Sequence, residues 1–233
     1  VYKNADIILV LGLSGGIFFP IFKLFKSKVI LNPDGAEWKR AKWNFLIKKF
    51  LKVSERIGIY FSDHVISDNL IISKEISNSY GITSTIAAYG GDHVKKIIIK
   101  DETLTKYNLV KDEYAFKVCR IEPENNIDII LEAFIETKIQ LILIGNWNNS
   151  SYGKNLKAKY SHYCNLLLLD PIYEQIVLDE LRGNCRIYIH GHSVGGTNPS
   201  LVEAMHLRLC CLVFDVNYNR ETTDDSAIYF KDK

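Results

Sequence analysis

Short runs rich in Ile, Val and Leu alternate with helix-like stretches along almost the whole 233-residue chain. Runs of about four to eight apolar residues between polar or glycine-containing segments are typical of strands buried on both faces. Parallel strands need a crossover connection, and a helix is the usual one. The alternation therefore predicts an α/β protein built from doubly wound parallel sheets.

Two series of elements follow one another along the chain. In the first, strands are expected at 5–12, 29–33, 65–67 and 85–87, and helices at 37–52 and 70–79. In the second, strands are expected at 114–119, 140–145, 166–169, 186–190 and 211–215, and helices at 126–137, 173–182 and 199–207. Gly90 and Gly91 lie between the two series and favour a hinge. We therefore expect two Rossmann-like domains, an N-terminal one over 1–91 and a C-terminal one over 92–233.

Charge and hydropathy exclude several classes of protein. The chain has 29 basic and 27 acidic residues, a net charge of +2, so no overall excess indicates a nucleic-acid partner. The apolar run 7–22 contains adjacent glycines and a proline, ends at Lys23, and is shorter than the roughly 20 residues of a membrane span. The run also lacks the basic leader and cleavage site of a signal peptide. The five cysteines form no CxxC motif, which favours reduced thiols in the cytoplasm.

The segment 190–205 carries the sharpest functional signal. It follows a predicted strand and enters a predicted helix. Adjacent glycines let the backbone approach a ligand, a polar residue can cap the helix, and a proline suits its first turn. The exposed amides and the helix dipole at such a corner favour an anion. The residues concerned are Gly195, Gly196, Thr197, Asn198 and Pro199.

Glu203 lies about one turn into the same predicted helix. A carboxylate there can accept hydrogen bonds from vicinal hydroxyls such as those of a ribose. The alternative is an ordinary capped turn with a solvated Glu203. His190 and His192 have no further ligand at supporting spacing, so the pattern does not favour zinc.

A second polar segment, 118–126, also links the end of a predicted strand to a predicted helix. Arg120 is expected to project from the strand end, where its guanidinium matches the geometry of a diphosphate. The alternative is a surface ion pair.

Together these segments resemble retaining GT-B glycosyltransferases of the family 4 type. The run 120–128, followed by Glu132-Ala133-Phe134, is similar to the donor-domain signature GRxxxxK before an EAF helix. The segment 190–205 is similar to the nucleotide-sugar segment that ends in Glu-Ala-Met. The exact residue sequence of these two segments resembles that of bacterial rhamnosyltransferases of polysaccharide assembly, as do the stretches 32–43, 63–69, 88–92 and 219–223.

The resemblance implies roles for individual residues. Arg120 matches the arginine that holds the donor diphosphate, and Glu203 matches the carboxylate on the nucleoside ribose. The loop that surrounds the sugar and phosphates is matched by Gly196, Thr197, Asn198 and Ser200.

Two positions depart from the wider family. Asn125 stands where many relatives have a lysine, and Gly195 stands where many have a glutamate that contacts the sugar. That sugar contact is then either absent or supplied by another residue, such as His190 or His192. We therefore expect Arg120, His190 and His192 as catalytic residues, and Asn125 and Gly195 within the donor site.

The implied reaction transfers L-rhamnose from dTDP-rhamnose to a lipid-linked saccharide, with retention and without a metal or a cofactor. It would serve capsule, O-antigen or cell-wall polysaccharide synthesis at the inner face of the cytoplasmic membrane. Other readings are a UDP- or GDP-hexose donor, or a non-catalytic nucleotide-sugar-binding module. An NAD-dependent oxidoreductase is less favoured because no GxGxxG follows the first strand. The resemblance also places the family's first strand and its closing helix outside the sequence, so the N-terminal domain is expected to be incomplete.

The acceptor side is expected in the N-terminal domain. Seven basic residues and one acidic residue lie between 39 and 56, interleaved with aromatic residues. A basic amphipathic helix of this kind is attracted to anionic lipid, although a solvated basic face on a core helix is the alternative. Asp34 and Glu37 precede it, and they either contact the acceptor hydroxyl or cap the helix. The expected acceptor-side residues are Asp34, Glu37, Trp38, Lys39 and Arg40.

Overall fold

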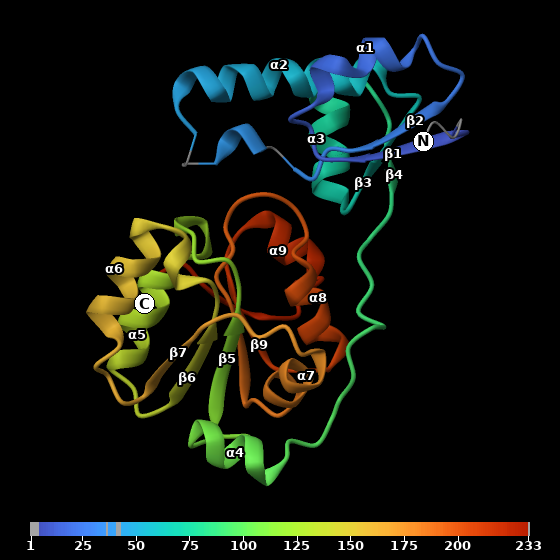
Figure 1. Ribbon diagram of the computed structural model, residues 1–233. Helices are drawn as coiled ribbons and strands as arrows, with labels where there is room; N and C mark the ends of the chain where they lie inside the picture. The colour runs from blue at the N-terminus through green and yellow to red at the C-terminus, as the bar shows by residue number, and fades with distance from the viewer. Residues whose placement is uncertain (1–4, 36, 41–42, 233) are drawn as a thin grey trace. The chain divides into compact units, whose positions relative to one another are not determined.

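The computed structural model describes residues 5–35, 37–40 and 43–232 (Figure 1). The chain forms two compact units. The first comprises the residues up to Tyr89 together with 194–197, and the second comprises 90–193 and the residues from Asn198 onward. Each unit is built on one parallel sheet. The α/β class with two parallel sheets, expected from the alternation of elements, is confirmed.

The first unit has four parallel strands in the order β1-β2-β3-β4. The strands are β1 (Ile7–Leu11), β2 (Lys28–Asn32), β3 (His64–Ser67) and β4 (Thr85–Ile86). They are connected by η1 (Gly16–Phe18), α1 (Phe19–Phe22), η2 (Glu37–Lys39), α2 (Phe45–Phe61) and α3 (Leu70–Tyr80). Val29, Leu31, Val65, Ile59 and Ile72 are buried in its core.

The apolar run that follows β1 packs against α2. A Cβ atom on Gly16 would lie only 2.3 Å from the carbonyl oxygen of Ser54, so glycine is required for this approach. The buried Ser54 hydroxyl donates to the carbonyl of Leu13 (2.7 Å) and accepts from the amide of Ile17 (3.1 Å). Gly16, one of the glycines that interrupt the apolar run, is therefore explained by close helix packing.

The helix expected over 37–52 is wrong in its bounds. Asn44 caps α2, because its Oδ1 accepts from the amide of Ile47 (3.0 Å), and the helix then continues to Phe61. Lys39 and Arg40 precede this helix, and Lys42 lies outside the described residues. The basic amphipathic pattern is consequently split between a loop and a helix.

The second unit has six parallel strands in the order β10-β9-β8-β5-β6-β7. They are β5 (Tyr114–Val118), β6 (Gln140–Ile144), β7 (Leu166–Leu169), β8 (Ile187–His190), β9 (Cys211–Phe214) and β10 (Ile228–Phe230). The helical elements are α4 (Asp101–Tyr107), η3 (Pro123–Asn125), α5 (Ile127–Ile135), η4 (Trp147–Asn149), α6 (Ser151–Tyr160), α7 (Gln175–Gly183), α8 (Pro199–His206) and α9 (Asn217–Thr222).

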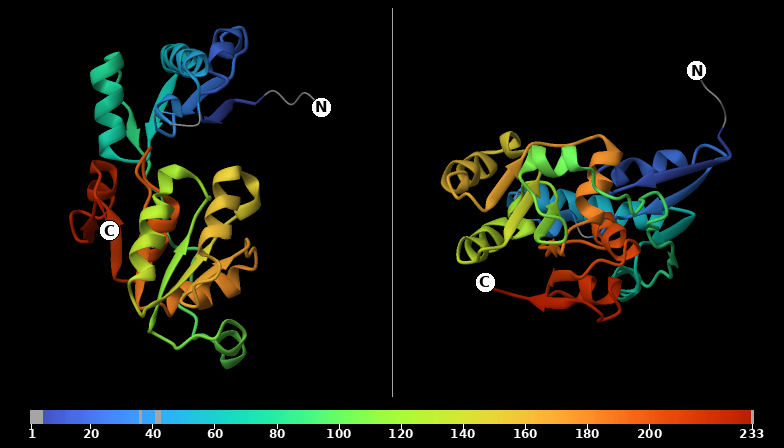
Figure 2. Two further views of the ribbon diagram at one scale, coloured as in Figure 1. Left: turned by 90° about the vertical axis from the view of Figure 1, so that its left-hand side faces the viewer. Right: turned by 90° about the horizontal axis from the view of Figure 1, so that it is seen from below.

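Helices cover both faces of this sheet (Figures 1 and 2). Tyr114 and Phe116 of β5 pack with residues of α7 and α8 on one face, whereas Ala115 packs with α5 and α6 on the other. This alternation follows from the two-residue period of a strand. The apolar stripe Ile127, Ile130, Leu131 and Phe134 of α5 is buried, as its helical spacing predicts.

The irregular segment 91–100 is held on α7 by buried polar groups. Asn184 donates from Nδ2 to the carbonyls of Ile97 (2.7 Å) and Glu180 (2.8 Å). Asp179 accepts from the amide of Lys95 (3.2 Å). These hydrogen bonds hold the segment in place, although it forms neither a strand nor a helix.

We expect Asn184→Ala to lower the free energy of unfolding by about 1–3 kcal/mol, because one buried and one partly buried carbonyl lose their donor. Urea unfolding followed by circular dichroism measures this change. Asn148→Ala removes an exposed amide on η4 and should change stability by less than about 0.5 kcal/mol. Equal losses in both variants would contradict the anchoring role.

Candidate functional site

The strand order of the second unit creates a topological switch point between β5 and β8. From β5 the chain moves outward through β6 and β7, and from β8 it moves outward on the other side through β9 and β10. Loops that leave neighbouring strands in opposite directions open a crevice at the carboxyl ends, where such sheets bind ligands. The two loops at this point are 119–126 and 191–198, the same two segments that the sequence singles out.

Hydrogen bonds join the two loops directly. Asn126 donates from Nδ2 to the carbonyl of Gly191 (2.7 Å), and Ser193 donates from its amide and its hydroxyl to the carbonyl of Glu124 (2.9 and 3.0 Å). A Cβ atom on Gly191 would lie 2.2 Å from the carbonyl oxygen of Asn125. Glycine is therefore required here, and hydrogen bonds join 124–126 to 191–193.

Asn125, which stands where many relatives have a lysine, is buried in this junction. Its Nδ2 donates to the carbonyl of Arg120 (2.8 Å), and its Oδ1 lies 3.3 Å from Nδ1 of His192. The amide thus fixes the backbone after β5 and the ring after β8 together. It adds no positive charge.

Arg120 projects outward at the end of β5, with 59% of its side chain exposed. Its Nη1 lies 3.7 Å from Glu122, a long ion pair that leaves the guanidinium accessible. Arg120 lines a cavity of about 260 Å³ at the carboxyl ends of β5, β6 and β7, together with Gly145 and Tyr173. The position suits an anion-binding role.

His190 ends β8 and is buried, and its Nε2 has no hydrogen-bond partner among the described residues. Burial lowers the pKa of His190 well below the ordinary value, and the nearby Lys117 and His192 lower it further. The rings of His190 and His192 lie 6.2 Å apart. Within the described residues, no group of three His, Cys, Asp or Glu side chains is placed to hold a metal ion.

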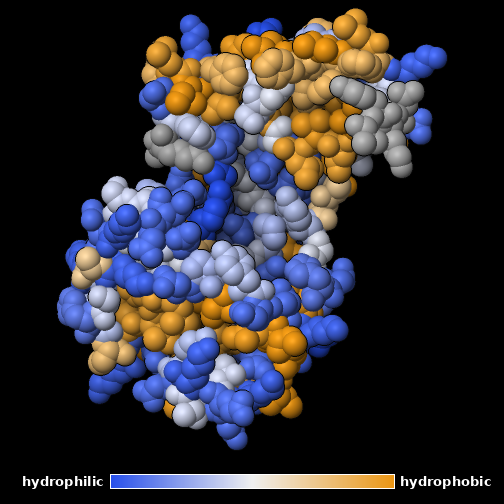
Figure 3. Space-filling view, in the orientation of Figure 1, coloured by the Kyte–Doolittle hydropathy of each residue, from blue (hydrophilic) through white to orange (hydrophobic). Residues whose placement is uncertain are grey.

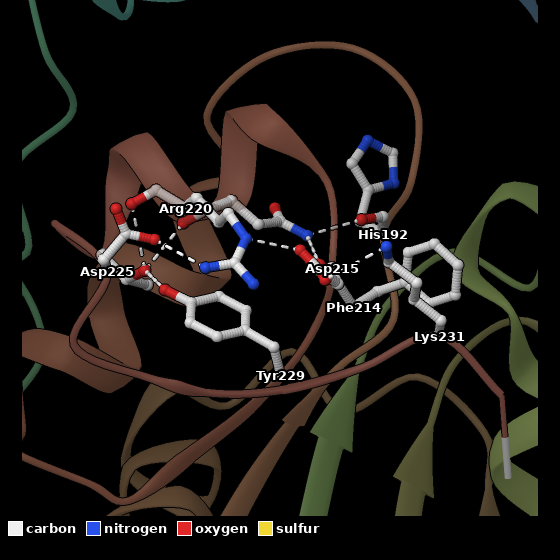
Figure 4. Close-up of polar contacts among 9 residues, drawn as sticks. His192, Phe214, Asp215, Arg220, Asp225, Tyr229 and Lys231 are labelled. Atoms are coloured by element: carbon white, nitrogen blue, oxygen red, sulfur yellow. Dashed lines mark hydrogen bonds and ion pairs between the residues drawn. The ribbon is translucent and has the colours of Figure 1, made fainter.

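The sequence analysis did not assign a role to Asn219, which supports this loop from α9. Its Nδ2 donates to the carbonyls of His192 and Phe214, both at 2.8 Å. The next residue, Arg220, contacts Asp215 and Asp225 and lies over the ring of Tyr229 (Figure 4). The motif 219–223 contributed to the family resemblance, and its first two residues prove to be structural supports.

Glu203 of α8 is held by Arg182 of α7 and by His93. Its Oε2 lies 2.5 Å from Nη1 of Arg182, and its Oε1 lies 2.9 Å from Nε2 of His93. Arg182 is buried, so this pair is largely shielded from water. The carboxylate is therefore fixed in place, and each oxygen keeps a further lone pair for a hydroxyl.

The start of α8 agrees with the predicted cap. Asn198 is the capping residue, and its Oδ1 accepts from the amide (3.1 Å) and the hydroxyl (2.7 Å) of Ser200. Pro199 occupies the first helical position. The preceding residues Gly195, Gly196 and Thr197 belong to the first compact unit.

Lys117, in the middle of β5, is a buried lysine that sequence reasoning missed. Burial lowers its pKa. The signal was a single lysine within the otherwise apolar strand Tyr-Ala-Phe-Lys-Val. It places a basic group within the sheet, three residues before Arg120.

The residues expected on the acceptor side lie in or beside η2 of the first unit. Glu37 accepts from Nε1 of Trp43 (3.1 Å) and pairs with Arg40 (2.8 Å). Lys39 pairs with Glu75 of α3 (3.2 Å). Asp34 has a left-handed backbone (φ 53°), and its amide donates to Asn32 (2.9 Å). Trp38 donates from Nε1 to Glu55 of α2 (3.0 Å).

We expect acid to destabilise the protein partly through His190. The folded state keeps this imidazole neutral, whereas the unfolded chain protonates it below about pH 6.5, so stability is present above that pH and falls below it. The contribution is about 1.4 kcal/mol per pH unit below pH 6.5. Urea unfolding between pH 7.5 and 5 should show a flatter pH dependence for His190→Gln than for the wild type. His162→Gln alters an exposed ring and should keep the wild-type slope, and an unchanged slope in His190→Gln would refute the assignment.

Solved structures of similar fold cover nearly the whole chain. Sucrose-phosphate synthase from Thermosynechococcus elongatus superposes with a TM-score of 0.77 at 14% identity, over 96% of this chain and 60% of that protein. HepE from Anabaena, solved with UDP-glucose, gives 0.75 at 10% identity, over 97% and 64%. The UDP-forming α,α-trehalose-phosphate synthase from Burkholderia xenovorans, solved with glucose-6-phosphate, gives 0.68 at 11% identity, over 98% and 63%. The chain spans less than two thirds of each of these proteins, and the similarity establishes a GT-B fold.

Two family models match the sequence, whereas no curated protein sequence matches it. Residues 3–92 match a domain of unknown function (DUF1972). Residues 100–230 match the glycosyl transferases group 1 model. The second match takes in more than half of the chain and contains both loops of the switch point. The chain belongs to the glycosyl transferases of group 1.

Proposed function

We propose that this protein transfers a sugar from a nucleoside diphosphate donor bound at the switch point of the second unit. The observation that supports the proposal is the strand order, which puts the loop of Arg120 and the loop that enters α8 after neighbouring strands of one sheet, with Glu203 about one turn into α8. An exposed guanidinium and helix-terminal amides suit a diphosphate. A fixed carboxylate suits ribose hydroxyls.

Catalysis would come from positioning the reactants and stabilising the diphosphate as it leaves. Arg120 would meet the negative charge that develops on the leaving group. His190 ends β8 and His192 lies in the loop that follows it, and we assign both residues to the sugar. Retention of the anomeric configuration remains part of the proposal.

For the donor we propose dTDP-rhamnose, because the residues at 120–128 and 190–205 resemble those of rhamnosyltransferases. HepE was solved with UDP-glucose, and the trehalose-phosphate synthase is described as UDP-forming. A UDP-hexose is therefore the alternative donor. For the acceptor we propose a lipid-linked saccharide in bacterial polysaccharide synthesis.

Removing the Glu203 carboxylate should weaken donor binding. We expect Glu203→Gln to raise the dissociation constant by about tenfold to a hundredfold, because charge-assisted bonds to the ribose are lost.

Arg120→Ala should instead reduce turnover far more than donor affinity. Calorimetric titration with dTDP-rhamnose, UDP-glucose and GDP-mannose measures affinity and identifies the nucleotide, and product release measures turnover.

Glu102→Gln, in α4, is the matched control because it removes one carboxylate from an exposed position. Urea unfolding of Glu203→Gln is needed beside the titration, because Arg182 loses a charged partner. Unchanged donor affinity in a folded Glu203→Gln would remove the ribose role, and normal turnover of Arg120→Ala at saturating donor would remove the diphosphate role.

We also propose that the first unit touches an anionic membrane surface. Figure 3 shows hydrophobic residues gathered on this unit, where Phe45 and Leu46 of α2 are 78% and 73% exposed and Leu24 is 82% exposed. Lys23 and Lys48 are neighbours of these residues in sequence. Exposed apolar side chains beside lysines suit the interface of an anionic bilayer. None of the helices in the described ranges has the length and apolar character needed to cross a bilayer.

The double variant Phe45→Ser/Leu46→Ser should bind phosphatidylglycerol vesicles at least about tenfold more weakly, because the apolar area that enters the interface is lost. Vesicle sedimentation measures the binding. Ile98→Ser, which changes an equally exposed apolar residue in the second unit, should bind like the wild type. Equal binding by all three proteins would refute membrane contact through α2.

A further inference from the structure

A cavity of about 760 Å³ lies entirely within the first unit, between η2, α2 and α3. Its volume is within the range of pockets that hold small ligands, about 300–1,000 Å³. Its lining includes four basic side chains, two acidic side chains and three aromatic rings. The lining is therefore more polar than that of a void left by imperfect packing of apolar side chains.

Three of the basic residues, Lys49, Lys52 and Arg56, come from one face of α2. Their spacing of three and four residues places them in a row along the helix. Lys52 Nζ lies 4.8 Å from the ring centroid of Trp38, and the Arg56 guanidinium lies 6.0 Å from that of Tyr60. Within residues 5–35, 37–40 and 43–232, none of the three cations forms an ion pair with a carboxylate. The row therefore offers positive charge to an anion.

Glu55 lines the same cavity and is 8% exposed. Its carboxylate accepts from Nε1 of Trp38 (3.0 Å) and from the hydroxyl of Tyr80 (2.5 Å). Burial raises the pKa of this carboxyl. Uncharged donors hold the group in one orientation, and an ionised carboxylate has about four acceptor sites, so two donors leave capacity for a ligand hydroxyl.

The remaining acidic residue of the lining has a local partner. Glu75 pairs with Lys39 across the cavity edge (3.2 Å). The cavity therefore combines a row of cations on α2 with a buried hydrogen-bond acceptor, Glu55, which comes from the same helix and lies beside aromatic rings.

We propose that this cavity binds a phosphorylated saccharide, with the phosphate on Lys52 and Arg56 and a sugar hydroxyl on Glu55. A phosphate ester matches the unpaired cations, and a sugar presents both hydroxyl donors and an apolar ring face to Trp38 and Tyr80. A free sugar phosphate and a lipid-linked one share this chemistry. The ligand would be the acceptor of the proposed transfer, an interpretation that rests on the proposed function, whereas the binding does not.

The test is calorimetric titration of the full chain with glucose 1-phosphate, glucose and inorganic phosphate. We expect glucose 1-phosphate to bind more tightly than either fragment. Lys52→Gln/Arg56→Gln should weaken glucose 1-phosphate and phosphate by about tenfold or more. Glu55→Gln should weaken glucose 1-phosphate by about tenfold and should not weaken phosphate, because its side chain contacts only the sugar. Lys74→Gln/Lys154→Gln removes the same charge outside the cavity and should bind like the wild type.

Competition by vesicles distinguishes the two sources of the ligand. Displacement of glucose 1-phosphate by phosphatidylinositol vesicles, but not by phosphatidylglycerol vesicles, supports a lipid-linked saccharide, and no displacement by either supports a soluble one. Equal displacement by both vesicles would refute recognition of the sugar. Wild-type affinity in the Lys52→Gln/Arg56→Gln variant, or no binding of glucose 1-phosphate to the wild type, would overturn the proposal. Titration of the same variants with dTDP-rhamnose tests the donor site separately, so that failure of the proposed cavity and failure of the proposed donor site can be distinguished.

Discussion

The close approach of two backbones at the carboxyl ends of β5 and β8 is the constraint on which the second unit's site depends. Gly191 passes so near the carbonyl of Asn125 that a methyl group cannot be inserted. The side chains of Asn125, Asn126 and Ser193 then satisfy the carbonyls that this approach buries. Buried backbone groups without partners are costly, so the polar residues of these loops serve the structure before they serve any ligand. The exposed Arg120 is presented by a junction that cannot easily rearrange.

Buried charge is the second theme of the molecule. Glu203 faces Arg182, and Glu55 accepts from Trp38 and Tyr80. Taking a carboxylate out of water is expensive unless its oxygens are hydrogen-bonded, and the same bonds fix its direction. In both units a carboxylate is thus held in a defined orientation, and in each case the side chain retains acceptor capacity for a ligand. The two carboxylates differ in their partners, a guanidinium for one and neutral donors for the other.

Much of the fold follows from short-range patterns. The strands expected from Ile, Val and Leu runs are present, since such runs are buried on both faces of a parallel sheet. The helices α4, α6 and α9 and the strand β10 were missed, because they are short or, in α6, carry few apolar residues. The start of α2 was misplaced because the basic and aromatic residues of 38–43 imitate a helical pattern, whereas Asn44 caps the helix later. At the candidate site, the cap at Asn198 was predictable because it bonds only to its neighbours.

The sequence by itself determined the class of fold, the two polar loops 119–126 and 191–198 and the local chemistry at their ends, because these depend on neighbouring residues and on periodicity. Only the tertiary structure decided that β5 lies beside β8, that Asn125 meets His192, and that Glu203 faces Arg182. The cavity around Glu55 was likewise invisible, because Trp38, Glu55 and Tyr80 come from three different elements. Contacts of this kind join residues tens of positions apart. They are set by strand order and helix packing, which a hydrophobic pattern does not encode.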